Sequence, residues 1–75
     1  MGIVVIVPLA ISRGAIDALD LLAQNNTVEE LPDAMGLPKT RVEVLLAEIR
    51  RYFHRRSVYD AIPLAIRQGV IPHRN

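Results

Sequence analysis

The residues best suited to chemistry in this sequence are cations gathered in one segment. Residues 39–56 hold six basic side chains and two carboxylates, for a net charge of +4. Residues 1–38 carry one arginine against five carboxylates, and residues 57–75 add +1, so the total of +1 hides a polarised chain. Such a segment suits contact with phosphate groups and is equally compatible with a solvated helix face. Its basic residues are Lys39, Arg41, Arg50, Arg51, Arg55 and Arg56.

Nothing comparable favours catalysis or metal binding. His54 and His73 stand far apart in a chain without cysteine, so a metal site is not expected. The serines and threonines that precede the predicted helices lack an adjacent base, and no glycine-rich phosphate loop is present. We therefore expect neither an enzyme nor a bound cofactor.

Length and composition limit the elements that can position the cations. The chain has 75 residues, 51% of them hydrophobic and none of them cysteine. One small domain must therefore be stabilised by packed apolar surface, and a chain of this size is marginal as a monomer. The composition thus indicates self-association.

The first ten residues predict a strand-like arm. Residues 3–7 form an apolar, β-branched run that ends at Pro8, and no polar residue alternates with it. A strand with two apolar faces needs cover, so we expect it to pair with the same strand of a second chain through Ile3, Val5 and Val7. Burial against the helices is the alternative. The run is too short to span a membrane and lacks the features of a signal peptide, which favours a cytoplasmic protein.

Residues 11–75 predict an all-helical domain behind this arm. Ser12 is expected to cap a helix over 13–24, and Thr27 with Glu30 to form a capping box for a short helix that Gly36 ends. A long helix is expected over 39–55, and a last one from Ser57, with Asp60 completing a second capping box, to Gly69. The apolar stripes of the first and third helices are Ile16, Leu19, Leu22 and Ala23, and Val42, Leu45, Leu46, Ile49, Tyr52 and Phe53.

The short and the long helix, joined at Gly36-Leu37-Pro38, match a helix-turn-helix in the lengths of the helices and in the residues of the turn. In such a pair the exposed side of the longer helix fits the DNA major groove. That side is predicted to display Thr40, Glu43, Val44, Ala47, Arg50, Arg51 and His54.

Several stretches of the helical region follow the spacing of a known family. They are Leu19-Asp20-Leu21-Leu22-Ala23, Thr27-Val28-Glu29-Glu30-Leu31, Met35-Gly36-Leu37, Val42 and Ile49, and the tail from Ala61 to Ile71. With these residues, the chain from Ile11 to Gly69 resembles the four-helix DNA-binding domain of LuxR-type (GerE-like) bacterial regulators. The resemblance implies transcriptional control by a homodimer on double-stranded DNA, with the third helix in the major groove. It also implies dimer contacts on the fourth helix, at Ile62 and Ile66.

The resemblance assigns groove-facing positions residue by residue. They are Lys39, Thr40, Arg41, Glu43, Val44 and Ala47, with Arg50 and Arg51 towards the DNA backbone. The chain departs from the family pattern at Glu43, where lysine is usual, and at Gly14, Ala15, Pro32, Pro38 and Pro63. Pro32 and Pro63 are each expected to remove a backbone donor in the middle of a helix.

Two functional hypotheses follow. In the first, the protein is a DNA-binding regulator. In the second, a helix-turn-helix that no longer reads DNA binds another regulator protein, as an anti-activator or co-regulator. Glu43 and Pro32 favour the second hypothesis, and the local charge of +4 favours the first.

Overall fold

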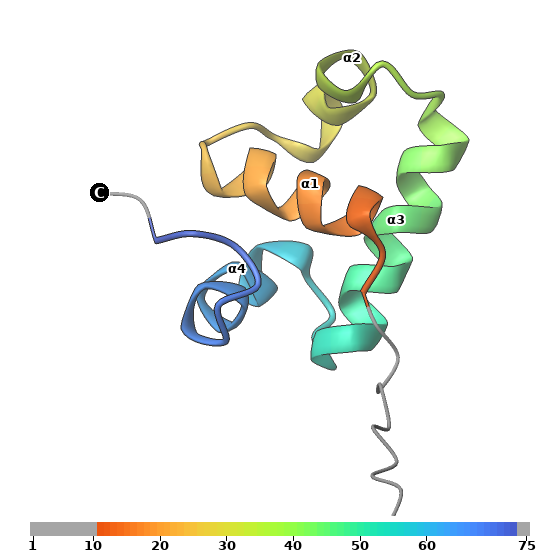
Figure 1. Ribbon diagram of the computed structural model, residues 1–75. Helices are drawn as coiled ribbons and strands as arrows, with labels where there is room; N and C mark the ends of the chain where they lie inside the picture. Colours follow the sequence, from red (N-terminus) through yellow and green to blue (C-terminus); the bar gives the residue numbers. More distant parts are fainter. Residues whose placement is uncertain (1–10, 74–75) are drawn as a thin grey trace, which may run out of the picture.

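The computed structural model describes residues 11–73, which are mainly helical, as predicted. The elements are α1 (Arg13–Ala23), the 3₁₀ helix η1 (Val28–Glu30), α2 (Leu31–Met35), α3 (Lys39–Phe53) and α4 (Val58–Arg67). Helix α1 lies across α3, with α2 at one end of α3 and α4 near the other (Figure 1). The predicted strand arm, with Ile3, Val5 and Val7, lies outside the described residues.

The hydroxyl and carboxylate caps form largely as predicted. Ser12 Oγ accepts a hydrogen bond from Ala15 N at 3.2 Å, and Glu30 Oε1 accepts one from Thr27 N at 2.7 Å. At α4 the prediction was half wrong. Ser57 Oγ does cap the helix, by accepting from Tyr59 N at 3.2 Å, but no bond from the Asp60 carboxylate to Ser57 N is found within residues 11–73.

Pro32 lies at the start of α2, so the prediction that it removes a backbone donor in the middle of a helix was wrong. The chain begins this segment as a 3₁₀ turn, in which Leu31 N donates to Val28 O. Pro32 then occupies the first turn of α2, where a backbone N–H has no intrahelical acceptor in any case. Pro63 does lie inside α4, as predicted.

The core forms where the helices face each other. Every predicted stripe residue of α3 is buried except Tyr52, which is half-buried. In α1, Leu19 and Leu22 are buried, whereas Ile16 and Ala23 are half-buried. The predicted stripe of α1 did not include two small residues that are fully buried, Ala15 and Ala18. Small side chains on this side of α1 let the helix approach its neighbours closely.

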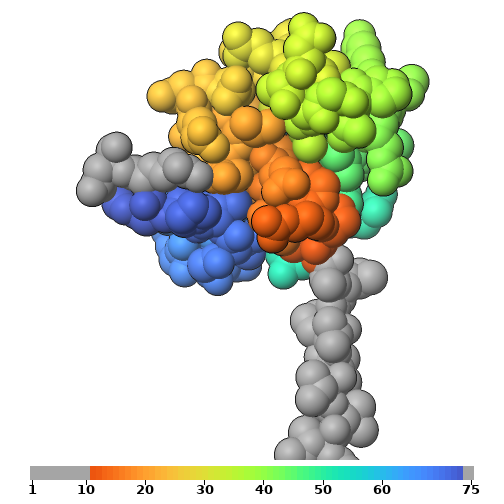
Figure 2. All heavy atoms as spheres, turned by 45° about the horizontal axis from the view of Figure 1, so that its top comes forward, coloured from red at the N-terminus to blue at the C-terminus, as the bar shows by residue number. Residues whose placement is uncertain are grey.

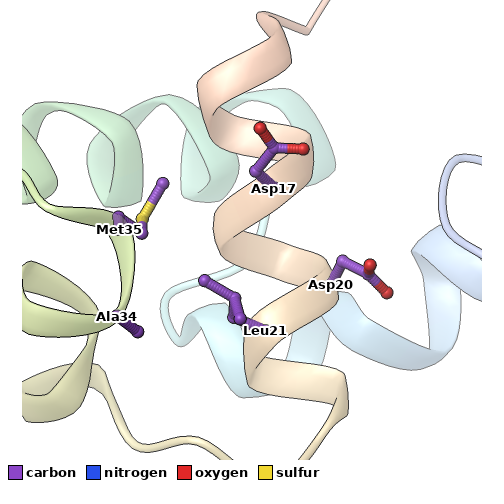
Figure 3. A pocket seen from close by; sticks show the side chains of 5 residues that line it. All are labelled: Asp17, Asp20, Leu21, Ala34 and Met35. Carbon is purple, nitrogen blue, oxygen red and sulfur yellow. The ribbon is translucent and has the colours of Figure 1, made fainter.

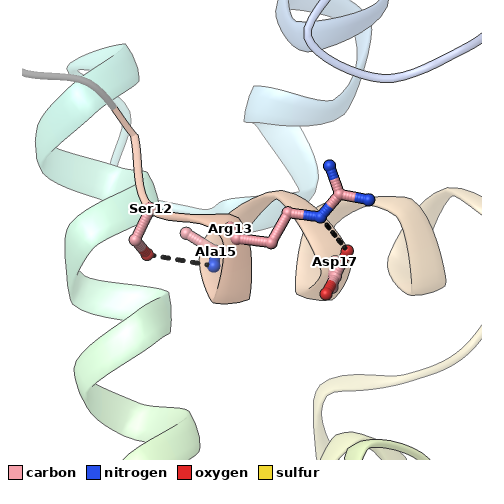
Figure 4. A network of polar contacts seen from close by, with 4 residues as sticks. All are labelled: Ser12, Arg13, Ala15 and Asp17. Atoms are coloured by element: carbon pink, nitrogen blue, oxygen red, sulfur yellow. Dashed lines mark hydrogen bonds and ion pairs between the residues drawn. The ribbon is translucent and has the colours of Figure 1, made fainter.

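Helices α1 and α3 approach each other closely at Gly14. A Cβ added to Gly14 would lie 3.1 Å from Leu45 Cδ2, tighter than ordinary van der Waals contact. Beside this contact, both oxygens of Glu48 accept from Ser12, Oε2 from the backbone N–H at 2.6 Å and Oε1 from Oγ–H at 2.7 Å. Figure 4 shows Ser12 beside α3, with its Oγ on the first turn of α1. Glu48 thus anchors the start of α1 to the middle of α3.

None of the helices in the described part of the chain is long and apolar enough to cross a membrane.

Replacing Ser12 or Glu48 by alanine is expected to cost about 1 kcal/mol of unfolding free energy each, since each change removes charge-assisted hydrogen bonds at a helix start. The double variant should lose less than the sum, with a coupling free energy of about 0.5–1 kcal/mol, because both changes break the bond between Ser12 Oγ and Glu48 Oε1. Urea denaturation measures all three variants.

Glu43→Ala is the matched control, since Glu43 is an exposed carboxylate on the same helix. It should change the unfolding free energy by less than about 0.5 kcal/mol. Strictly additive effects of the Ser12 and Glu48 substitutions would contradict the anchoring role of Glu48.

Candidate nucleic-acid interface

The side of α3 that faces away from α1 carries the residues predicted to meet DNA. Seven of the eight are exposed and Ala47 is half-buried. Val44 is exposed over 59% of its surface, which is unusual for a large apolar residue in this structure. The exposed residues are Lys39, Thr40, Arg41, Glu43, Val44, Arg50 and Arg51.

The cations on this side lie at the two ends of α3. Lys39 and Arg41 belong to the first turn, and Arg50 and Arg51 belong to the last. With a rise of 1.5 Å per residue, the two groups are about 15 Å apart along the helix axis. The B-DNA major groove is about 12 Å wide, so a helix in the groove could bring these side chains to phosphates on both of its edges.

The two carboxylates of this segment have different surroundings. Glu48 is turned to Ser12 and so is withdrawn from the exposed side. Glu43 remains exposed, and within residues 11–73 no ion pair is found for it. Glu43 is therefore the exposed carboxylate of α3, and Glu48 is half-buried. Sequence reasoning missed the role of Glu48, because its partner is 36 residues away.

The turn before α3 fixes where the helix begins. Gly36 adopts a left-handed conformation with φ 65°, and Leu37 N donates to Pro32 O at 3.0 Å across the turn. Pro38 then has extended backbone, with ψ 151°, and its carbonyl accepts from Arg41 N and Val42 N. The predicted turn residues Gly36, Leu37 and Pro38 thus lead the chain from α2 into α3.

The end of α3 is set by a histidine. His54 has φ 55°, and Arg55 N donates to Arg50 O at 3.0 Å. The helix therefore stops at Phe53, and the prediction that it reaches Arg55 was wrong. Arg55 and Arg56 are exposed in the turn that follows, next to the last turn of α3.

A second link that the sequence did not reveal joins α4 to the start of η1. Tyr59 Oη accepts a hydrogen bond from Val28 N at 2.9 Å, although the tyrosine is 46% exposed. Since η1 leads directly into α2, this bond holds the short helix in place relative to α4. The two residues are 31 positions apart in the sequence, so no local sequence pattern predicts this hydrogen bond.

The predicted dimer residues of α4 lie at the edge of the core. Ile62 and Ile66 are both half-buried and pack against the buried cluster. They are four residues apart and so share one side of the helix. Part of each side chain stays open to solvent.

An open hollow of about 310 Å³ lies between α1 and α2. Its apolar residues are Leu21, Ala34 and Met35, and Asp17 and Asp20 complete its lining (Figure 3). Asp17 also pairs with Arg13 of the same helix, with Nε to Oδ1 at 3.4 Å (Figure 4).

No group of three or more histidine, cysteine or acidic side chains suited to a metal ion exists within residues 11–73. His54 serves the end of α3, and both it and His73 are exposed. Ser12 and Ser57 act as helix caps.

Comparison of the chain with protein-family models, with curated proteins and with solved structures found no match.

The left-handed residues before and after α3, Gly36 and His54, predict opposite effects of substitution on stability. His54→Gly should raise the unfolding free energy by up to about 1 kcal/mol, because glycine adopts a left-handed conformation without steric cost. Gly36→Ala should lower it by about 1 kcal/mol for the same reason, since an added Cβ meets nothing within 4 Å and only the backbone conformation is penalised. Thermal and urea unfolding test both variants, and stabilisation by Gly36→Ala would contradict the left-handed turn.

Proposed function

We propose that this protein is a small DNA-binding transcriptional regulator of the LuxR type. In this proposal α2 and α3 act as a helix-turn-helix, and α3 enters the major groove of double-stranded DNA. The observation that carries the proposal is the exposed side of α3, which has cations at both ends, with Glu43, Val44 and Ala47 between them. This is the distribution that a groove-binding helix needs, because phosphates border the groove and base edges lie on its floor.

The ends and the middle of α3 have different tasks in the proposed complex. Lys39 and Arg41 at the first turn, and Arg50 and Arg51 at the last, meet phosphates. Thr40, Val44 and Ala47 lie between them and are suited to thymine methyl groups. Glu43 is the one carboxylate on this side, and it can accept a hydrogen bond only from a cytosine amino group.

The regulator is proposed to act as a homodimer. Ile62 and Ile66 of α4 are half-buried and so leave apolar surface for a second copy. The strand arm, through Ile3, Val5 and Val7, is the other proposed contact. In a symmetric dimer, two α3 helices would meet successive major grooves about 34 Å apart.

An interaction module is the second candidate function, as an anti-activator or co-regulator that binds another regulator. Two observations favour it. Val44 is 59% exposed, and an exposed apolar side chain suits a protein partner as well as a thymine methyl. Glu43 beside it repels phosphate.

Fluorescence anisotropy with random duplex DNA at two salt concentrations tests the proposal. We expect affinity to fall steeply as salt rises, with a slope of about −0.9 per phosphate contact. Arg51→Gln should weaken binding and reduce that slope by about 1, because one contact is lost. Arg13→Gln is the matched control: it removes the same charge from an exposed arginine on α1 and should leave the slope unchanged. Undetectable duplex binding at low salt would refute the regulator and favour the interaction module.

Glu43→Lys should strengthen DNA binding, because it removes a repulsion and adds a cation on the proposed groove side. The salt slope should steepen by about 0.9 if the new lysine reaches a phosphate. Glu29→Lys makes the same charge change at an exposed carboxylate of η1 and controls for the effect of net charge alone. Equal gains from the two variants would show that Glu43 does not face the DNA.

A further inference from the structure

The described part of the chain has an acidic side and a basic side. Residues 11–38, which form α1, η1 and α2, carry one arginine against five carboxylates. Residues 39–56, which form α3 and the following turn, carry +4. In Figure 2, α1 lies in the middle of the view, η1 and α2 lie above it, and the visible part of α3 lies at the right. Net negative charge thus belongs to α1, η1 and α2, and net positive charge belongs to α3 and the turn after it.

The acidic side contains the hollow between α1 and α2. Leu21 extends from α1 towards α2, and Met35 extends from α2 towards α1, so the two side chains border the hollow with Ala34 (Figure 3). Asp17 and Asp20 of α1 also line the hollow, and Figure 3 shows the Asp20 carboxylate directed away from α2. Asp17 already holds one guanidinium, that of Arg13, in an exposed pair. The hollow therefore suits an apolar side chain that is accompanied by cations.

The basic side of α3 presents such a group. Val44 is 59% exposed, and Arg41 and Arg51 are exposed at positions i−3 and i+7 from it. At 3.6 residues per turn these spacings place both arginines on the same side of the helix as Val44. Glu43 lies about 100° around the helix from Val44, so it stands at the margin of this set.

We propose that a second copy of this chain docks on the hollow through its α3. Val44 of one copy enters the apolar hollow between α1 and α2 of the next copy, and Arg41 and Arg51 approach the carboxylates at its edge. The two surfaces are complementary in polarity and charge, because an apolar side chain among cations meets an apolar hollow among carboxylates. The contact goes beyond the proposed function and does not depend on it.

The geometry makes this contact head-to-tail. The two surfaces are different parts of the chain, so each copy offers one surface to one neighbour and the other surface to the next. Such a contact joins copies into chains or rings and does not stop at a symmetric pair. It is distinct from the symmetric α4 dimer. Because the charges are exposed, salt weakens the contact over a screening length of about 10 Å at 0.1 M. In a DNA-binding regulator this assembly covers the side of α3 that reads DNA, so assembly and DNA binding compete.

Sedimentation velocity with a charge-swap pair of the full chain tests the proposal. The first variant, Asp17→Lys with Ala34→Lys, makes the hollow basic. The second, Arg41→Glu with Arg51→Glu, makes the Val44 side of α3 acidic. All four positions are exposed, so the fold should tolerate the changes, and circular dichroism checks this.

At low salt the wild type should show a concentration-dependent rise in weight-average mass, to at least about twice that of either variant alone. Each variant alone should lack this rise, and an equal mixture should recover it, because the basic α3 of the first variant now meets the acidic hollow of the second. A wild-type mass that does not change with concentration, or a mixture with the same mass as its components, would overturn the proposal. Loss of the rise in the wild type at high salt is expected as well.

This readout uses no DNA and therefore stands apart from the proposed function. Added duplex should lower the wild-type mass to that of a protein–DNA complex without further copies. The hollow variant keeps its α3 side and should bind duplex DNA at least as well as the wild type does. If it binds no duplex but the mixture still assembles, the regulator proposal fails and the self-association stands.

Discussion

The crossing of α1 over α3 sets the orientation of the other helices in this fold. At Gly14 the two helices approach so closely that Leu45 leaves little room for a side chain. Ala15 and Ala18 are fully buried along the same helix, and Glu48 anchors Ser12 with both carboxylate oxygens. Apolar contact and charge-assisted hydrogen bonds thus act at one place, and together they fix the rotation of α3 about its own axis.

That rotation decides which residues of α3 reach solvent. With Leu45 and Ile49 turned into the core, Val44, Thr40 and Arg51 must point outward. The anchor also removes Glu48 from the exposed side, which leaves Glu43 as the only carboxylate of α3 there. One interaction therefore sets both the orientation and the charge of the surface on which the functional proposals rest.

Local features of this fold could be predicted from the sequence, and long-range ones could not. Ser12, Thr27, Gly36 and the apolar stripe of α3 act within one or two helical turns, so their spacing carries the information. Placing Pro32 correctly required knowing that the chain starts this segment as a 3₁₀ turn. The Ser12–Glu48 and Tyr59–Val28 bonds join residues more than 30 positions apart, and the hollow combines side chains of α1 and α2. Such groups become neighbours only through packing, which no local spacing encodes.

The two proposed partners of α3 place the same chemical demand on it. A thymine methyl in the major groove is an apolar group bordered by phosphates. The hollow of a neighbouring copy is an apolar surface bordered by carboxylates. An exposed valine between arginines is complementary to both, so a helix side fitted to one is partly fitted to the other. What separates them is charge density, because duplex DNA carries one negative charge per about 1.7 Å of axis, far more than two aspartates supply. DNA should therefore displace a neighbouring copy from α3. Glu43 reduces the difference between the two affinities, because its carboxylate is repelled more strongly by the phosphates than by the hollow.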